Sequence, residues 1–182
     1  QIKAAQTISG SLTRTVIDLP MNNIFETTQQ ELDKAGFRIE RKDFDRPWGG
    51  FFVIDEKQAA DFTARYFPGI NNADLIGGRK VSPKILLVAP HKRLSWQYHH
   101  RRSEVWRVVE GKVGVVRSDT DEPGDLEEYR QGDLITLAKG ERHRLVGLDT
   151  WGKVAEIWQH TDPDQPSDEE DIVRLQDDFG RS

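Results

Sequence analysis

The sequence contains no cysteine, and this absence excludes several kinds of site at once. A disulfide framework, a thiolate zinc site, an iron–sulfur cluster and a cysteine nucleophile all need a residue that the chain lacks. Any metal ion must therefore be held by imidazole, carboxylate or amide groups.

Long hydrophobic runs are also missing. No stretch approaches the roughly 18 apolar residues needed to span a bilayer, and the N-terminus lacks the basic-then-apolar pattern of a signal peptide. We therefore expect a soluble, cytoplasmic protein. Its 182 residues are typical of one domain with its own core. The single methionine is Met21, so residues 1–20 are either an added segment before the native start or an upstream extension.

Negative charge dominates the chain as a whole, but not the stretch from Arg79 to Arg107. The sequence has 26 basic and 31 acidic residues, a net charge of −5. Eight basic residues and one acid lie in that stretch, so it carries +7 and the rest of the chain −12. This asymmetry favours a small anionic ligand over nucleic acid, and ordinary solvated charges at strand edges are the alternative.

Short apolar runs separated by turn residues begin at about Arg46. The expected strands are residues 50–55, 81–89, 94–99, 104–110, 112–117, 133–138, 143–149 and 153–159. Many short strands at regular spacing predict an all-β barrel or sandwich. Glycine-containing turns interrupt residues 57–79, which predicts an inserted loop with a short helix. We thus expect a barrel domain over residues 46–182 after an N-terminal extension over residues 1–45.

Two capping signals predict short helices near the ends of the chain. Thr28 and Glu31 match a capping box, and Gly36 is a typical helix stop. In the acidic C-terminal tail, Ser167 and Glu170 match a second capping box.

Four polar residues in and after the basic stretch form a candidate metal site. Gln97 and His99 are two positions apart, so on a strand they face the same side. Glu104 follows across a tight connection, and His143 comes from a distant strand. In a small barrel these side chains can converge, and their donors suit zinc or another divalent ion with one open position. The alternative is a set of buried polar residues that satisfy one another.

Other histidines and the tryptophans are weaker candidates. His100 has the opposite parity to His99, so we expect it to point away from the ligand face. Trp48, Trp96, Trp106 and Trp158 are expected to pack in the core more often than to form sugar platforms.

The spacing of the candidate ligands resembles the two signatures of the cupin family. The first signature is matched by Gln97-x-His99-x4-Glu104-x6-Gly111, and the second by Gly132-x5-Ala138-x-Gly140-x2-His143. Gln97 stands where a first histidine is usual, and Ala138 stands where proline is usual. Glutamine still offers an oxygen ligand, so metal binding survives this change.

Three strings in order resemble the cupin domain of type II phosphomannose isomerases. They are RPWG at 46–49, RLSWQYHH at 93–100 and EDIVRLQDDFGR at 170–181. The resemblance implies an all-β double-stranded β-helix, the cupin or jelly-roll barrel, with short flanking helices. The chain departs from the family pattern at Arg101 and Val105, where histidines are usual.

The same resemblance implies a divalent metal cofactor, with zinc favoured and manganese, cobalt, nickel or iron as alternatives. Its ligands would be Gln97, His99, Glu104 and His143. We expect no membrane or nucleic-acid partner. We expect the protein to form a homodimer.

By the same resemblance, Lys84 and Arg174 would be catalytic. The phosphate of the implied substrate would need fixed cations, which the +7 stretch supplies, and Lys84, Arg93 and Arg174 are the first candidates to bind it. The general base is left open between Lys84 and a metal-bound hydroxide. The expected reaction is aldose–ketose isomerisation of a sugar phosphate, first of all mannose 6-phosphate to fructose 6-phosphate. The alternatives are a cupin enzyme for another sugar or nucleotide-sugar, and a non-catalytic sugar-binding cupin.

Overall fold

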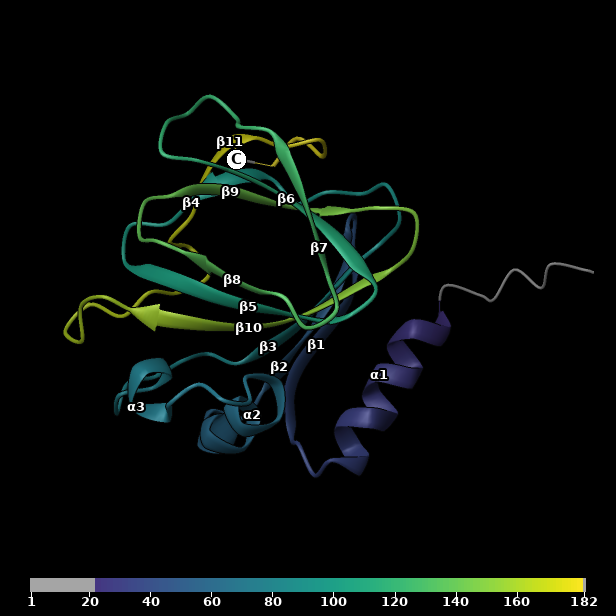
Figure 1. Ribbon diagram of the computed structural model, residues 1–182, viewed down its shortest axis with the longest axis vertical. Coiled ribbons are helices and arrows are strands. Elements are labelled where there is room, and N and C mark those ends of the chain that lie inside the picture. The colour runs from purple at the N-terminus through teal and green to yellow at the C-terminus, as the bar shows by residue number, and fades with distance from the viewer. Residues whose placement is uncertain (1–21, 182) are drawn as a thin grey trace, which may run out of the picture.

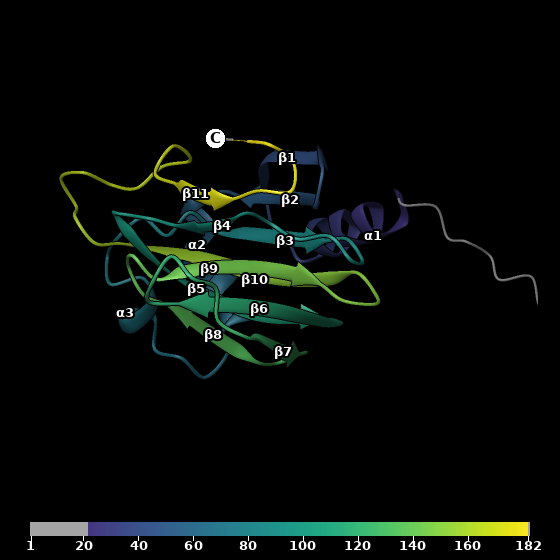
Figure 2. The same cartoon turned by 90° about the horizontal axis from the view of Figure 1, so that it is seen from above.

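The computed structural model describes residues 22–181 and consists mainly of two antiparallel sheets that face each other (Figures 1 and 2). The strands are β1 (Ile39–Arg46), β2 (Gly49–Ile54), β3 (Lys84–Val88), β4 (Trp96–Tyr98), β5 (Arg102–Glu110), β6 (Lys112–Ser118), β7 (Leu126–Arg130), β8 (Leu134–Leu137), β9 (Arg142–Gly147), β10 (Gly152–His160) and β11 (Val173–Gln176). One sheet has the order β1-β2-β3-β10-β5-β8, and the other β11-β4-β9-β6-β7. This architecture confirms the predicted all-β barrel.

All eight expected strands are present, and three strands were not expected. β1, β7 and β11 each lie at the edge of a sheet; β1 and β7 are rich in charged residues, and β11 has only four residues. They lack the apolar runs by which strands were recognised, because an edge strand can leave much of its surface in solvent. β1 pairs with β2 from Ile39 onward, so the sheet begins before the predicted domain boundary at residue 46.

The N-terminal helix α1 (Asn22–Lys34) begins before the predicted capping box. Thr28 lies in the middle of α1 and is buried, so its predicted role as a helix cap is wrong. The predicted stop is present: Gly36 has φ +82°, and the N–H of Phe37 donates to the carbonyl of Leu32. The alternatives for residues 1–20 lie outside the described residues.

The predicted helix in the acidic tail is wrong. The carboxylate of Asp168 accepts the backbone N–H groups of Glu170 and Asp171, and the chain turns there and enters β11. This local hydrogen bonding competes with a helix, as is usual for Asp in turns. The insertion holds the 3₁₀ turn η1 (Glu56–Gln58) and two short helices, α2 (Ala59–Tyr66) and α3 (Asn72–Leu75).

Alternation along the strands divides the apolar side chains between two cores. The outer core lies between the six-stranded sheet and the helices, and includes Leu32, Phe62, Ile85 and Ile157. The inner core lies between the two sheets and includes Leu86, Val108, Val115, Leu145 and Val154. Successive residues of β3 and β10 enter opposite cores, as the period of two requires. Within the described part of the chain, no helix is long and apolar enough to cross a membrane.

Candidate metal centre

The inner face of the six-stranded sheet changes from apolar to polar along its length. On β10, Val154 belongs to the inner core, whereas Glu156 and Trp158 line a pocket. The neighbouring strands also become polar at this point, because Lys84 on β3 pairs with Glu156 and Glu104 on β5 pairs with Trp158. Antiparallel register therefore gathers the polar residues of three strands at one end of the barrel.

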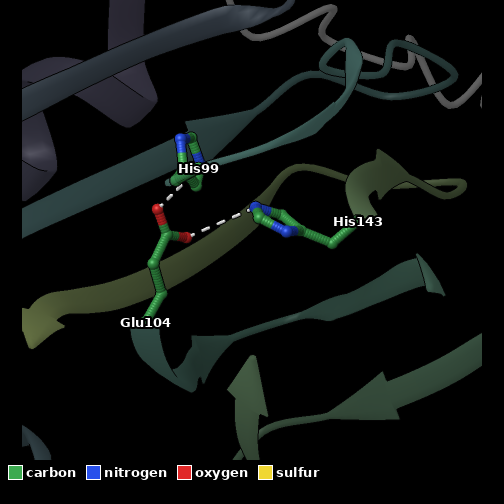
Figure 3. A group of neighbouring side chains, drawn as sticks. All are labelled: His99, Glu104 and His143. Atoms are coloured by element: carbon green, nitrogen blue, oxygen red, sulfur yellow. Dashed lines mark ion pairs between the residues drawn. The ribbon is translucent and has the colours of Figure 1, made fainter. Parts of the chain in front are cut away.

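His99, Glu104 and His143 meet at this end, and Figure 3 shows the carboxylate between the two rings. Nε2 of His99 lies 3.2 Å from Oε1 of Glu104, and Nε2 of His143 lies 3.5 Å from Oε2. One possible ligand atom from each residue lies within 4.8 Å of the others, and all three side chains are buried. We call these three residues the His–Glu cluster.

Backbone carbonyls orient both imidazole rings. Nδ1 of His99 donates to the carbonyl of Asp171 at 2.6 Å, and Nδ1 of His143 donates to the carbonyl of Glu141 at 2.9 Å. When the rings are neutral, these bonds leave Nε2 of each ring free of a proton and directed toward Glu104, which is the tautomer that binds a metal. The buried Nε2 of His143 has no hydrogen-bond partner among residues 22–181. This donor set fits a divalent cation.

Charge states in the cluster also suit a cation. Burial raises the pKa of Glu104, but the charges of His99 and Arg102 outweigh it and hold the pKa well below its usual value. Burial lowers the pKa of His143 to about 4. An ionised carboxylate beside a neutral imidazole is the state that metal ligation requires.

Arg102 was not recognised as a site residue from the sequence. Its Nε donates to Oε1 of Glu104 at 2.9 Å, and its Nη2 lies 3.3 Å from Nε2 of His99. Its guanidinium also lies 3.6 Å from the ring centroid of Trp158. Arg102 thus supplies positive charge directly at the cluster, and its place in the +7 stretch was the available signal.

The acidic tail holds part of the site in position. Asp171 binds His99 through its carbonyl, while its carboxylate accepts the backbone N–H groups of His100 and Arg101. The hydroxyl of Ser167 donates to the same carboxylate at 2.6 Å. His100 itself is exposed, as its parity predicted.

The predicted ligand Gln97 lies on β4 directly opposite His143 on β9. Its side chain lines the pocket with Glu104, and its Oε1 accepts the hydroxyl of Ser95 at 2.6 Å. Gln97 therefore brings an amide oxygen to the same end of the barrel, on the strand position that pairs with His143 of the His–Glu cluster.

The predicted catalytic residues Lys84 and Arg174 both line the pocket, but the predicted phosphate-binding residue Arg93 does not. Nζ of Lys84 donates to Glu169 of the tail at 2.6 Å and lies 3.8 Å from the ring centroid of Trp158. Arg93 instead makes two hydrogen bonds to Asp178. Its side chain is therefore engaged outside the pocket.

Besides Arg102, two further arginines that were not singled out from the sequence join Arg174 in the lining, and we call Arg46, Arg174 and Arg181 the arginine group. The two further residues are Arg46, from the RPWG string, and Arg181, from the C-terminal string. Burial lowers the pKa of Arg174, and repulsion from Arg181 and Arg46 lowers it further. The three guanidinium groups thus add positive charge to one pocket, where Arg181 also donates two hydrogen bonds to Asp177 and Arg46 is paired with Asp43.

The tryptophans divide between packing and pocket lining. Trp96 is fully buried, as expected of a core residue, and its indole donates to the carbonyl of Asp121. Trp48, Trp106 and Trp158 are buried too, but they also line the pocket. These three side chains therefore pack in the core and also form part of the pocket wall.

Comparison with known proteins supports this description. The protein-family model described as "Mannose-6-phosphate isomerase C-terminal" matches residues 35–177 of this chain. The xanthan biosynthesis protein XanB of Xanthomonas campestris is 32% identical over 137 residues, 75% of this chain and 23% of that protein. The mannose-1-phosphate guanylyltransferase of Escherichia coli K12 is 27% identical over 144 residues, 79% of this chain and 24% of that protein. The chain thus spans about a quarter of these relatives.

Solved structures agree on the fold. A variant of Bacillus subtilis oxalate decarboxylase OxdC has a TM-score of 0.51 at 12% identity, over 74% of this chain and 30% of that one. Vicilin from Corylus avellana has a TM-score of 0.50 at 15% identity, over 76% and 36%. With the family match over most of its length, the chain belongs to the family of mannose-6-phosphate isomerase C-terminal domains.

Proposed function

We propose that this chain is a metal-dependent aldose–ketose isomerase for a sugar phosphate, with mannose 6-phosphate and fructose 6-phosphate as the first pair to test. The observation that carries the proposal is the His–Glu cluster, whose two Nε2 atoms converge on one buried carboxylate. The family match and the arginine group beside the same pocket support it.

His99, Glu104 and His143 would hold the metal ion, with Gln97 as a further oxygen donor, and zinc is the first candidate. When bound, the ion would polarise the carbonyl and hydroxyl oxygens of an open-chain sugar. Arg102 adds positive charge where negative charge develops on those oxygens. Trp106 and Trp158 line the same pocket and add apolar surface to its wall.

The arginine group would bind the phosphate. Arg46 and Arg181 have more exposed side chains than Lys84 and Arg102, so they lie nearer the mouth of the pocket. Guanidinium groups bind phosphate in a bidentate manner, and three of them suit a terminal phosphate better than a neutral sugar hydroxyl. The sugar would then extend from the mouth toward the His–Glu cluster.

Elemental analysis of the purified protein, followed by an isomerase assay, tests the proposal. The panel should contain mannose 6-phosphate, glucose 6-phosphate and free mannose, each with zinc, manganese, cobalt or nickel supplied. We expect turnover of a hexose phosphate and little turnover of free mannose. Binding of a sugar phosphate without conversion by any metal-loaded form would overturn the isomerase proposal and favour a non-catalytic sugar-binding domain.

A further inference from the structure

Glu156 is a buried carboxyl in the pocket wall to which the proposed function gives no task. Its side chain is 6% exposed and lies on the inward row of β10, between Lys84 of β3 and Trp106 of β5. The indole of Trp106 donates to its Oε2 at 2.8 Å, and the indole of Trp158 donates to its Oε1 at 2.9 Å. Its hydrogen-bond partners within residues 22–181 are thus neutral groups.

The other two carboxyls that line the pocket are held by cations. Glu104 accepts a hydrogen bond from Arg102, and Glu169 accepts one from Lys84. Opposite charge stabilises a carboxylate and makes it a weak base. Glu156 alone among the three combines burial with neutral donors, so it is the pocket carboxyl best suited to accept a proton.

A carboxyl group in this position is expensive for the fold. Burial of a carboxyl that no cation contacts by a hydrogen bond is unfavourable, and the next inward residue on the strand, Val154, shows that an apolar side chain packs there. Burial and the nearby charge of Glu104 raise the pKa of Glu156 to about 8, while the charges of Lys84 and Arg102 and the indole N–H of Trp106 act in the opposite direction. A buried pocket carboxyl whose two oxygens accept only neutral N–H donors among the described residues is placed to take and return a proton.

We propose that Glu156 is the catalytic residue that carries the proton between C2 and C1 of the sugar. The inference rests on the proposed function and adds the residue that performs its central step. The carboxylate removes the proton from C2, and the electron pair of that bond forms the C1–C2 double bond of an enediolate while the carbonyl π electrons move to O1. The carboxylic acid then returns the proton to C1 as the carbonyl forms at C2, and the proton of the C2 hydroxyl passes to O1 through solvent.

Lys84, considered from the sequence as a base, lies next to Glu156 but has another engagement. Its ammonium donates to Glu169 at 2.6 Å and lies over the ring of Trp158. Lys84 is thus placed to hold Trp158, and through its indole Glu156, in position.

The test compares three proteins under metal-saturated conditions: wild type, Glu156→Gln and Glu156→Asp. Glu128→Gln, an exposed residue of β7, is the matched control. Steady-state rates are measured with mannose 6-phosphate, and exchange of its C2 proton with deuterated solvent is followed by NMR. Metal content and the affinity for mannose 6-phosphate are measured on each variant to show that the site remains formed.

We expect Glu156→Gln to lower kcat and C2 exchange at least 100-fold with nearly unchanged metal content and affinity. Glu156→Asp should recover part of both rates, because it restores the carboxyl group at a shorter reach. Activity of Glu156→Gln equal to that of wild type would overturn the assignment. Equal losses in Glu156→Gln and Glu156→Asp would also overturn it, because they would indicate a packing role.

The experiment separates this inference from the proposed function. C2 exchange by the wild type without release of ketose would overturn the isomerase proposal, and loss of that exchange in Glu156→Gln would still support Glu156. Normal isomerisation by Glu156→Gln would overturn only the role of Glu156. Absence of both exchange and isomerisation in the metal-loaded wild type would overturn both.

Discussion

The two faces of the six-stranded sheet have different compositions although they are built from the same strands. On β10, Ile157 belongs to the outer core beneath the helices, while the preceding residue, Glu156, faces the pocket between the sheets. On β3, Ile85 and Lys84 show the same contrast. The outer face is apolar apart from Lys153, which is buried against Glu31 and Glu110, whereas the inner face is apolar at one end and polar at the other.

This difference separates stability from chemistry at neighbouring residues. The outer core stabilises the sheet by burying apolar surface. The inner polar end buries carboxyl, imidazole and guanidinium groups, which reduces the gain from burial and makes reactions possible. Substitutions on the two faces should therefore affect different measured quantities.

The largest effect should come from the His–Glu cluster. His99→Ala removes one of the converging Nε2 atoms, so we expect loss of bound metal and of turnover together. His100→Ala is the matched control, because that neighbouring ring is exposed. Metal analysis and the isomerase assay check both. Full turnover by His99→Ala would refute the metal role of the cluster.

On the outer face, Ile157→Ala should lower the free energy of unfolding by about 2–5 kcal/mol, because it leaves a cavity in a fully buried site. Turnover per folded molecule should stay close to that of wild type. Urea unfolding and an active-site titration measure the two quantities. A large loss of kcat in fully folded protein would break the proposed division between the faces.

At the mouth of the pocket, Arg46→Ala should lower kcat/KM for a sugar phosphate about 10–100-fold, the usual range for a charge-assisted hydrogen bond. Activity toward an unphosphorylated sugar should not change. Arg93→Ala is the control, since Arg93 binds Asp178 instead of lining the pocket. A larger effect of Arg93→Ala would restore the phosphate role predicted from the sequence.

The smallest effect concerns the stability cost of Glu156. Its folded-state pKa of about 8 lies above the value of about 4.3 for an unfolded chain. As pH rises from 4 to 8 the unfolded state loses this proton first, so the carboxyl destabilises wild type progressively over that window. Glu156→Gln should therefore gain stability relative to wild type between pH 4 and 8, on the order of 1 kcal/mol at pH 7. The free energy of unfolding of both proteins is measured at several pH values in this range. A difference between the two proteins that does not change with pH would contradict the prediction.

The sequence did not predict three of the edge strands, and it predicted two N-terminal helix caps that the structure does not contain. Central strands were recognisable because burial on both faces demands apolar runs, as in KILLV of β3. The charged strand β7, LEEYR, gives no such signal, because its stability comes from pairing with β6. Both capping boxes misled because the pattern is short: one lies inside α1, and the other forms a turn held by Asp168.

The candidate site divides in the same way. The spacing of His99, Glu104 and His143 was sufficient to group them, since period-two strands in a small barrel leave few ways to arrange them. Glu156 left one sequence signal, a single acid within the apolar run VAEIW of its strand. Arg46 and Arg181 stood in strings that were noticed but were not connected with a phosphate.

By itself, the sequence determined the all-β class, the central strands and the chemical type of the candidate metal ligands, because each depends on periodicity or on short spacing along the chain. Only the tertiary structure decided that Arg46, Arg174 and Arg181 share one pocket, that Arg93 does not line it, and that two indoles hold Glu156. Those relations depend on pairing between strands distant in sequence and on how the tail crosses the barrel. No local pattern encodes such distances.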